Sequence, residues 1–302
     1  MLGWEGGTMT QTGPLGGHVR QLGLIGYPVG HSVSPAMHNA AFADQRMNCH
    51  YAAWAVEPAN LKDAVAGIRA LGFLGVNVTI PHKEAVIPLL DEVAPTAAQA
   101  GAVNTIVNRG GRLVGYNTDG WGFLSSLEEA GVKLPGLEVV VLGAGGAARA
   151  IALGLARSRV ARITISNRTP ERAERLATDV SKLVADVPVT AVEALSPEER
   201  AALIDAGMVV NCTPLGMAGA NAGLSALSDI NLLPQQAVVY DTVYTPQDTR
   251  LLKEARLRGL RAVGGLGMLV HQGACAWEYW FGRRGPVGVM TGAARAALEG
   301  AV

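Results

Sequence analysis

The chain has 302 residues, with 25 basic and 25 acidic side chains, so its formal charge is balanced. Neither nucleic acid nor an anionic membrane surface is indicated as a partner, and a small molecule fits better. The longest apolar stretch, VVVLGAGGAARAIALGLA, is interrupted by glycines and by Arg149, which argues against a membrane-spanning helix. Cys49, Cys212 and Cys275 lie far apart without metal-ligand spacing, so we expect structural thiols, no metal site and a cytoplasmic protein.

The first 20 residues are rich in Gly and Thr and lack the basic start and apolar core of a signal peptide. We expect a disordered extension over residues 1–20. Met9 is an alternative start to Met1, because the periodic pattern begins only at LGLIGYP.

From residue 21 to 118, short apolar runs such as QLGLIGYP and GFLGVNVTI alternate with helical stretches such as PANLKDAVAGIRALG and KEAVIPLLDEVA. A second series of strand, helix and strand units runs from LEVVVLG to LRAVGG, and a helical segment follows it. This pattern predicts two α/β domains, with the C-terminal helical segment returning to the first. Clefts between domains are the usual place for ligands, so we expect the site there.

The stretch GHSVSPAMHNAAF places Ser32 and Ser34 on either side of Val33, just before Pro35 and a predicted helix. Serines before a helix usually cap it, but a cap needs only one of them. The pair therefore favours a site for a small anion or a hydroxyl group.

The stretch NVTIPHKEAV places Lys83 shortly after a strand-like alternation that ends at Ile80. Pro81 fits the first position of a helix, so Lys83 would lie in its first turn. An ammonium group is disfavoured at that positive end of the helix dipole. The alternative is a solvated surface lysine beside Glu84.

In VVVLGAGGAARA, the residues Gly143, Gly145 and Ala148 match the G-x-G-x-x-A turn directly after a buried strand. Gly143 permits the tight turn, and Gly145 lets the backbone approach a pyrophosphate. The alternative is a packing turn without a ligand, although strand, spacing and helix all agree with a dinucleotide site. We expect a Rossmann-type domain over residues 119–264 and a substrate-binding domain over 21–118 plus 265–302.

The next strand, in ITISNRTPER, ends at Asn167 and Arg168, where NAD-specific proteins usually carry an acid. Arg168, Thr169 and Arg172 supply donors that suit a 2′-phosphate, and Arg168 has a planar face for adenine. The alternative is a pair of solvated arginines at the start of a helix. The set indicates NADP as the cofactor.

The chain resembles the shikimate dehydrogenase family over nearly its whole length after the N-terminal extension. The resemblance is carried by GHSVSP, NVTIPHKE, AGAVNTI, YNTDGWG, GAGGAARA, SNRT, NCTPLGM, YDTVY and GMLVHQGA. It implies NADPH-dependent, reversible reduction of 3-dehydroshikimate to shikimate in chorismate and aromatic amino acid biosynthesis. The departures from the family pattern are small and fall at Val33, His82 and Gly267.

By this resemblance, Lys83 and Asp119 form the catalytic pair, although Asp119 alone is also typical of a turn in NTDG. Lys83 delivers the proton to the developing alkoxide, and Asp119 holds it in position. The implied substrate-binding residues are Ser32 and Ser34 for the carboxylate, and Asn77, Thr79, Asn104, Tyr244 and Gln272 for the hydroxyl groups. The implied NADP-binding residues are Gly143, Ala144, Gly145, Gly146, Ala147, Asn167, Arg168, Thr169, Arg172, Thr242 and Gly265.

Two other functions are weighed against this one. A quinate/shikimate dehydrogenase would turn over quinate comparably and use NAD. A non-catalytic NADP-binding regulator would keep the fold and lose the chemistry, but the intact Lys83 and Asp119 argue against it. We expect a monomer or a homodimer that binds neither nucleic acid nor a membrane.

Overall fold

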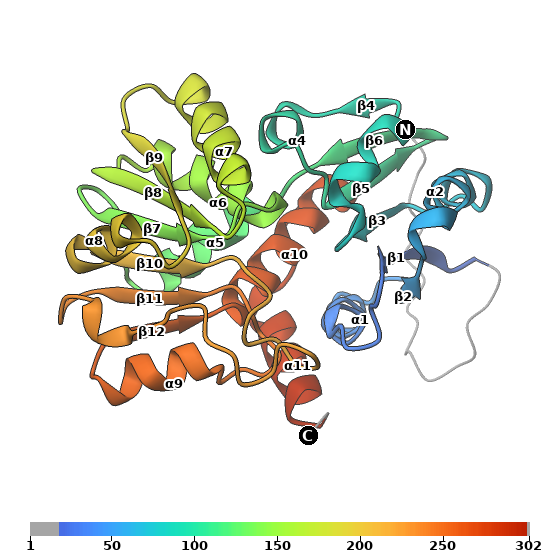
Figure 1. Cartoon of the computed structure of the whole chain (residues 1–302). Coiled ribbons are helices and arrows are strands. Elements are labelled where there is room, and N and C mark those ends of the chain that lie inside the picture. Colours follow the sequence, from blue (N-terminus) through green and yellow to red (C-terminus); the bar gives the residue numbers. More distant parts are fainter. Residues whose placement is uncertain (1–17, 301–302) are drawn as a thin grey trace.

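A computed structural model describes residues 18–300 of the chain (Figure 1). Most of the predicted N-terminal extension, including Met9, lies outside the described residues. Two six-stranded sheets stand side by side, one built from β1–β6 and the other from β7–β12. The predicted α/β fold with two units is confirmed. Within residues 18–300, no helix is both long and apolar enough to cross a membrane.

The first sheet has the strand order β2-β1-β3-β5-β6-β4, in which β1 pairs in parallel with β2 and β3, while β5 runs antiparallel to β3 and β6. Most of β1 is buried, as expected for a parallel strand covered on both faces. The strands are β1 (Arg20–Gly26), β2 (Cys49–Ala55), β3 (Gly75–Val78), β4 (Glu92–Val93), β5 (Thr105–Arg109) and β6 (Arg112–Tyr116). Its helices are α1 (Ser34–Asp44), η1 (Pro58–Asn60), α2 (Leu61–Ala70) and α4 (Pro95–Ala100).

The helix predicted over KEAVIPLLDEVA is wrong. The chain forms only the single turn α3 (His82–Ala85), then the 3₁₀ turn η2 (Ile87–Leu89) and the strand β4. Pro88 accounts for the break, because a proline lacks the N–H for the helical ladder and its ring clashes with a carbonyl one turn earlier. Pro81 precedes α3 as its N-cap residue. A single turn has only a small dipole, so the helix-end argument made for Lys83 loses its weight.

The second sheet is parallel throughout, with the order β12-β11-β10-β7-β8-β9. This is the doubly wound order of dinucleotide-binding folds, and its switch point lies between β7 and β10, where a crevice opens at the carboxyl ends. The strands are β7 (Glu138–Leu142), β8 (Arg162–Asn167), β9 (Val189–Glu193), β10 (Met208–Asn211), β11 (Val238–Asp241) and β12 (Arg261–Gly264). The helices around it are α6 (Gly146–Arg157), α7 (Pro170–Leu183), α8 (Pro197–Asp205), η3 (Ile230–Leu232) and α9 (Arg250–Leu257).

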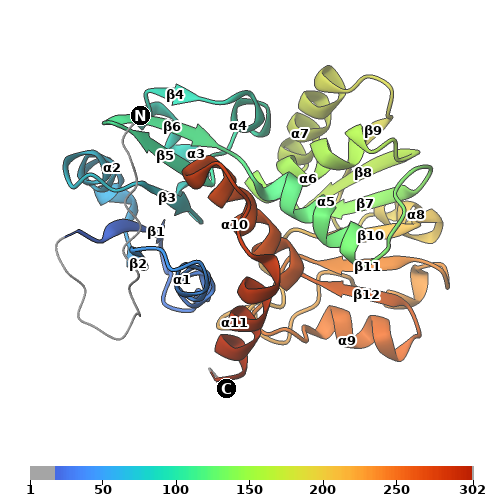
Figure 2. The ribbon, with the colours of Figure 1, turned by 180° about the vertical axis from the view of Figure 1, so that it is seen from behind.

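Three helices join the two halves: α5 (Asp119–Glu129), α10 (Leu266–Phe281) and α11 (Val287–Glu299). Figure 2 shows α10 running diagonally between the sheets, with α5 against it. Trp277 of α10 and Met290 of α11 share a buried core with Met37 and Phe42 of α1. The predicted return of the C-terminal segment to the first unit is therefore confirmed.

Candidate active site

A cavity of about 300 Å³ takes its walls from both halves of the molecule. Of the residues implied by the sequence, eleven line it: Ser32, Ser34, Thr79, Lys83, Asn104, Asp119, Ala147, Thr242, Tyr244, Gly265 and Gln272. The carboxyl end of β3 and the turn α3 bring Thr79 and Lys83 to this wall. Residues far apart in the sequence are thus gathered around one space of ligand size.

Lys83 and Asp119 face each other across this wall, with Nζ of the lysine 2.5 Å from Oδ2 of the aspartate. The side chains are 18% and 5% exposed, so water screens this ion pair less than it would screen a surface pair. Asp119 is the first residue of α5, not a turn residue, and a carboxylate is favoured at that positive helix end. Asn104 donates from Nδ2 to the other oxygen, Oδ1, at 2.8 Å.

Asn104 is held in one orientation by its neighbours. Its Oδ1 accepts from the backbone N–H of Thr118 at 2.9 Å, so its Nδ2 must be the group that faces Asp119. The same Nδ2 lies 3.3 Å from Oε1 of Gln272, which extends the network to α10. The aspartate, the amides and Lys83 therefore form one polar wall whose geometry is set before any substrate binds.

Asn77 lies behind that wall and does not line the cavity. Its Oδ1 accepts from the Tyr51 hydroxyl at 2.7 Å, while its Nδ2 donates to the backbone oxygen of Asn104 at 3.1 Å and to Oγ1 of Thr105 at 3.0 Å. Both donors of the Asn77 amide are thus engaged within the protein.

The two serines sit at the entry to α1, where Val33 is the N-cap residue and its own side chain makes no cap hydrogen bond. Oγ of Ser32 accepts from the backbone N–H of Ser34 at 3.3 Å. Burial raises the pKa of Tyr244, and a hydrogen bond with Ser32 offsets part of the rise. The phenol therefore stays protonated near neutral pH. Three hydroxyl groups, from Ser32, Ser34 and Tyr244, lie on this part of the cavity.

Gly143, Ala144 and Gly145 form the turn between β7 and α6, and Gly146 and Ala147 are the first residues of α6. Gly143 has φ +104°, and a Cβ there would lie 3.1 Å from Cγ2 of Thr213. At Gly145 a Cβ would meet nothing within 4 Å, and no side chain caps α6. Open space above uncapped helix amides fits the pyrophosphate of a dinucleotide.

The end of β8 and the start of α7 carry the residues that indicated NADP. Nδ2 of Asn167 donates to the backbone oxygen of Thr169 at 2.9 Å, which shapes this loop. Arg168, Thr169 and Arg172 are exposed, and neither arginine forms an ion pair within residues 18–300. Two exposed guanidinium groups beside the pyrophosphate turn fit a phosphate monoester.

Three family models match consecutive parts of the chain: the shikimate dehydrogenase substrate binding domain at residues 24–106, shikimate / quinate 5-dehydrogenase at 126–208, and the shikimate 5′-dehydrogenase C-terminal domain at 265–295. A shikimate dehydrogenase (NADP(+)) of Symbiobacterium thermophilum is 65% identical over 281 residues, covering 93% of this chain and 95% of that protein. The chain belongs to the shikimate dehydrogenase family.

Solved structures of the family agree with the fold. Shikimate 5-dehydrogenase of Thermus thermophilus, in complex with NADP(H) and shikimate, superposes with a TM-score of 0.83 at 38% identity, covering 93% of this chain and 100% of that one. A quinate dehydrogenase of Corynebacterium glutamicum, in complex with NAD, has a TM-score of 0.83 at 35% identity and covers 92% of this chain and 99% of that one. The similar proteins thus include both substrate preferences.

Sequence reasoning missed Asp241, which ends β11 in the family motif YDTVY. This fully buried carboxylate accepts from Asn211 Nδ2 at 2.9 Å, from the Val243 N–H at 3.0 Å and from Thr249 Oγ1 at 2.7 Å. Burial raises its pKa, and the three hydrogen bonds oppose the rise. Asn211 in turn accepts from Thr213, so Asp241 ties together two loops that line the cavity. Asp241 forms no ion pair within residues 18–300. Beyond its place in the motif YDTVY the sequence carries no signal for it, because burial cannot be read from a local pattern.

Proposed function

We propose that this chain is an NADP-dependent shikimate dehydrogenase that reversibly reduces 3-dehydroshikimate to shikimate. The observation that carries the proposal is the Lys83–Asp119 pair, set 2.5 Å apart on a cavity wall that also includes Ala147 of the cofactor turn. A proton donor and the cofactor turn therefore meet at one space. Membership of the family supports the same reaction.

NADPH, when bound, supplies the hydride that reduces the ring ketone. Lys83 donates a proton from Nζ to the oxygen that becomes the new hydroxyl group, so the carbonyl gains one hydride and one proton. Asp119 keeps the ammonium group in place and favours its charged form before transfer. In the oxidative direction, the same lysine nitrogen accepts the hydroxyl proton.

The substrate is anchored by hydroxyl and amide groups. Ser32 and Ser34 donate to the carboxylate, and Thr79, Asn104, Tyr244 and Gln272 hydrogen-bond the ring hydroxyls. Because both donors of Asn77 are engaged, we assign it an indirect role, in which it supports Asn104 from behind. A site that bonds hydroxyl groups rejects analogues that lack them.

The cofactor is NADP, held by the turn from Gly143 to Ala147 and by Asn167, Arg168, Thr169 and Arg172, with Thr242 and Gly265 near the nicotinamide. We divide the chain into a substrate-binding domain at 21–118 plus 265–302 and a Rossmann-type domain at 119–264. We further propose a cytoplasmic monomer or homodimer.

The deciding experiment compares steady-state kcat/KM for shikimate and quinate, each with NADP and NAD. We expect shikimate with NADP to give the highest value by a wide margin. Comparable turnover of quinate with NAD would instead favour a quinate/shikimate dehydrogenase, the alternative suggested by the similar quinate dehydrogenase. No turnover of any pair by the folded protein would favour a regulator.

A further inference from the structure

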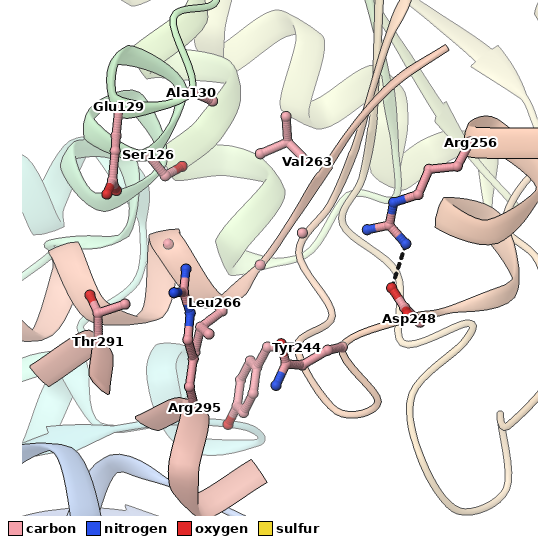
Figure 3. Close-up of a pocket in the computed structure, with 14 residues that line it drawn as sticks. Ser126, Glu129, Ala130, Tyr244, Asp248, Arg256, Val263, Leu266, Thr291 and Arg295 are labelled. Atoms are coloured by element: carbon pink, nitrogen blue, oxygen red, sulfur yellow. Dashed lines mark hydrogen bonds and ion pairs between the residues drawn. The ribbon is translucent and has the colours of Figure 1, made fainter. Parts of the chain in front are cut away.

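A second cavity, of about 330 Å³, is drawn in Figure 3. It adjoins the catalytic cavity, since Tyr244 and Gly265 line both. Its walls are α5, the loop after β11, α9, β12, the start of α10 and the helix α11. The first sheet's core includes α11, whereas β11 and β12 belong to the second sheet. A molecule in this cavity would therefore touch both halves of the protein.

The charged side chains that line the cavity differ in whether they have a partner of opposite charge. Asp248 forms an ion pair with Arg256 on one wall, and Glu129 lies 2.9 Å from Nε2 of His271 on another. Arg295 projects from α11 into the cavity and has neither an ion pair nor a hydrogen bond within the described part of the chain (Figure 3). The free charge in this space is thus a guanidinium group, which binds a carboxylate through two parallel hydrogen bonds.

Other residues that line the cavity restrict the chemical class of ligand it can bind. Thr291 lies one helical turn before Arg295 on the same wall, so its hydroxyl group can add a third donor. Val263, Leu266 and Ala130 line the cavity with apolar surface.

We propose that this cavity is an effector site for a small organic carboxylate with an apolar body. The carboxylate pairs with Arg295 and Thr291, and the body lies against Val263 and Leu266. Tyr244 carries the effect to the catalytic cavity, because its side chain lines both spaces. The site itself does not depend on the proposed reaction.

Calorimetric titration tests the binding, with benzoate as the probe and benzamide as its uncharged analogue. The full-length protein is first saturated with NADPH and shikimate, a non-reacting combination that fills the catalytic cavity and the cofactor site. We expect saturable benzoate binding that is weakened about tenfold by Arg295→Gln and by replacing benzoate with benzamide, and less by Thr291→Val. Arg200→Gln, on an exposed arginine of α8, is the matched control and should leave the affinity unchanged.

Equal benzoate affinity in wild-type protein and Arg295→Gln, or no saturable binding, would overturn the site. Thermal unfolding without benzoate verifies that each variant folds. The wild-type and Arg295→Gln proteins are also compared without NADPH and shikimate. A difference in benzoate affinity that persists there supports the second cavity even if the proposed reaction fails, since that cavity needs neither molecule.

The effector role is tested by linkage. Benzoate, at constant ionic strength, should change the apparent shikimate KM of wild-type protein severalfold but leave Arg295→Gln unaffected, and shikimate should shift the benzoate Kd correspondingly. Benzoate binding that leaves the shikimate KM and its dissociation constant unchanged would overturn the effector role.

Discussion

At the scale of single residues, the charges of Lys83 and Asp119 stabilise each other in the site. Asp119 is almost fully buried and is satisfied by Lys83 and Asn104. Removing one member of a buried ion pair leaves the other charge uncompensated, which costs more than losing an exposed pair. Tests of catalysis at this wall therefore need a measure of folding beside the measure of rate.

Lys83→Met keeps most of the side-chain length and removes the group that titrates. We expect kcat to fall by roughly 10²–10⁴-fold, the usual effect of losing a positioned proton donor, with a smaller change in the shikimate KM. Steady-state kinetics with thermal unfolding measure this, and Lys62→Met on an exposed position of α2 is the control. A loss of tenfold or less in folded Lys83→Met protein would exclude the lysine as the donor.

His38 makes the stability of the fold depend on pH. It is fully buried, stacks on Tyr51 with ring centroids 4.3 Å apart, and accepts from Trp277 Nε1 at Nδ1, 2.8 Å away. Burial lowers its pKa from 6.5 to about 3, so the folded protein resists protonation that the unfolded chain accepts. Above pH 6.5, His38 is neutral in both the folded and the unfolded state and its stabilising contribution is fully present. As the pH falls toward 3, the unfolded chain binds a proton that the folded protein does not, so the free energy of unfolding decreases.

His38→Asn keeps an acceptor for Trp277 and removes the titrating ring. The difference in unfolding free energy between wild-type protein and this variant should shrink by a few kcal/mol as the pH falls from about 7 to 4. Denaturant unfolding across that range measures it, with exposed His31→Asn as the control. A pH-independent difference would contradict a depressed pKa for His38.

At the scale of elements, we propose that cofactor choice is set by the loop between β8 and α7. Arg168 directly follows β8 and Arg172 lies in the first turn of α7, and both side chains are exposed. Neither is held by an acid in the described part of the chain, so both are free to meet a phosphate. Strand ends of this kind present loop residues to a ligand while the sheet holds their spacing.

Arg168→Ala should raise the NADP KM about tenfold or more and barely change the NAD KM, because a charge-assisted bond to the 2′-phosphate contributes about 1.5–3 kcal/mol. Steady-state kinetics with each cofactor provide the measurement. Arg175→Ala, on an exposed residue farther along α7, is the control. Equal losses with both cofactors would assign Arg168 to adenine stacking or to folding.

At the scale of the whole molecule, the two halves are joined where α5 crosses α10 (Figure 2). Gly122 lies at this crossing, where an added Cβ would be 2.7 Å from Cβ of Gln272 and 2.8 Å from the backbone oxygen of Met268. A side chain at this position therefore fits only if the two helices move apart. Since Gln272 lines the catalytic cavity, the crossing also places one wall of the site.

Gly122→Ala should lower the free energy of unfolding by about 1–3 kcal/mol, because overpacking at backbone contacts outweighs the helix propensity gained. Gly67→Ala in α2 is the matched control, since its Cβ would meet nothing within 4 Å, and should stabilise by about 0.5–1 kcal/mol. Denaturant unfolding compares the two. A stabilised Gly122→Ala protein would show that the helices can separate without cost.

Local pattern was sufficient for much of this protein. The apolar run before Gly143, the glycine spacing and the following helix predicted the cofactor turn, because these features lie within about a dozen neighbouring residues. The alternating strands and helices predicted the α/β class for the same reason. The helix predicted after Lys83 was wrong where Pro88 and the pairing of β4 with β6 outweighed helical periodicity.

The sequence by itself determined the family motifs, the identities of Lys83 and Asp119 and the donors at Arg168, since each is a property of residue types in a short segment. Only the tertiary structure decided that Asp119 begins a helix, that Asn77 lies behind the cavity wall and donates to the backbone oxygen of Asn104, and that Asp241 ties two loops together. These outcomes depend on burial and on contacts between distant segments. Free energies of desolvation and packing arise only when those segments meet, so no local pattern records them.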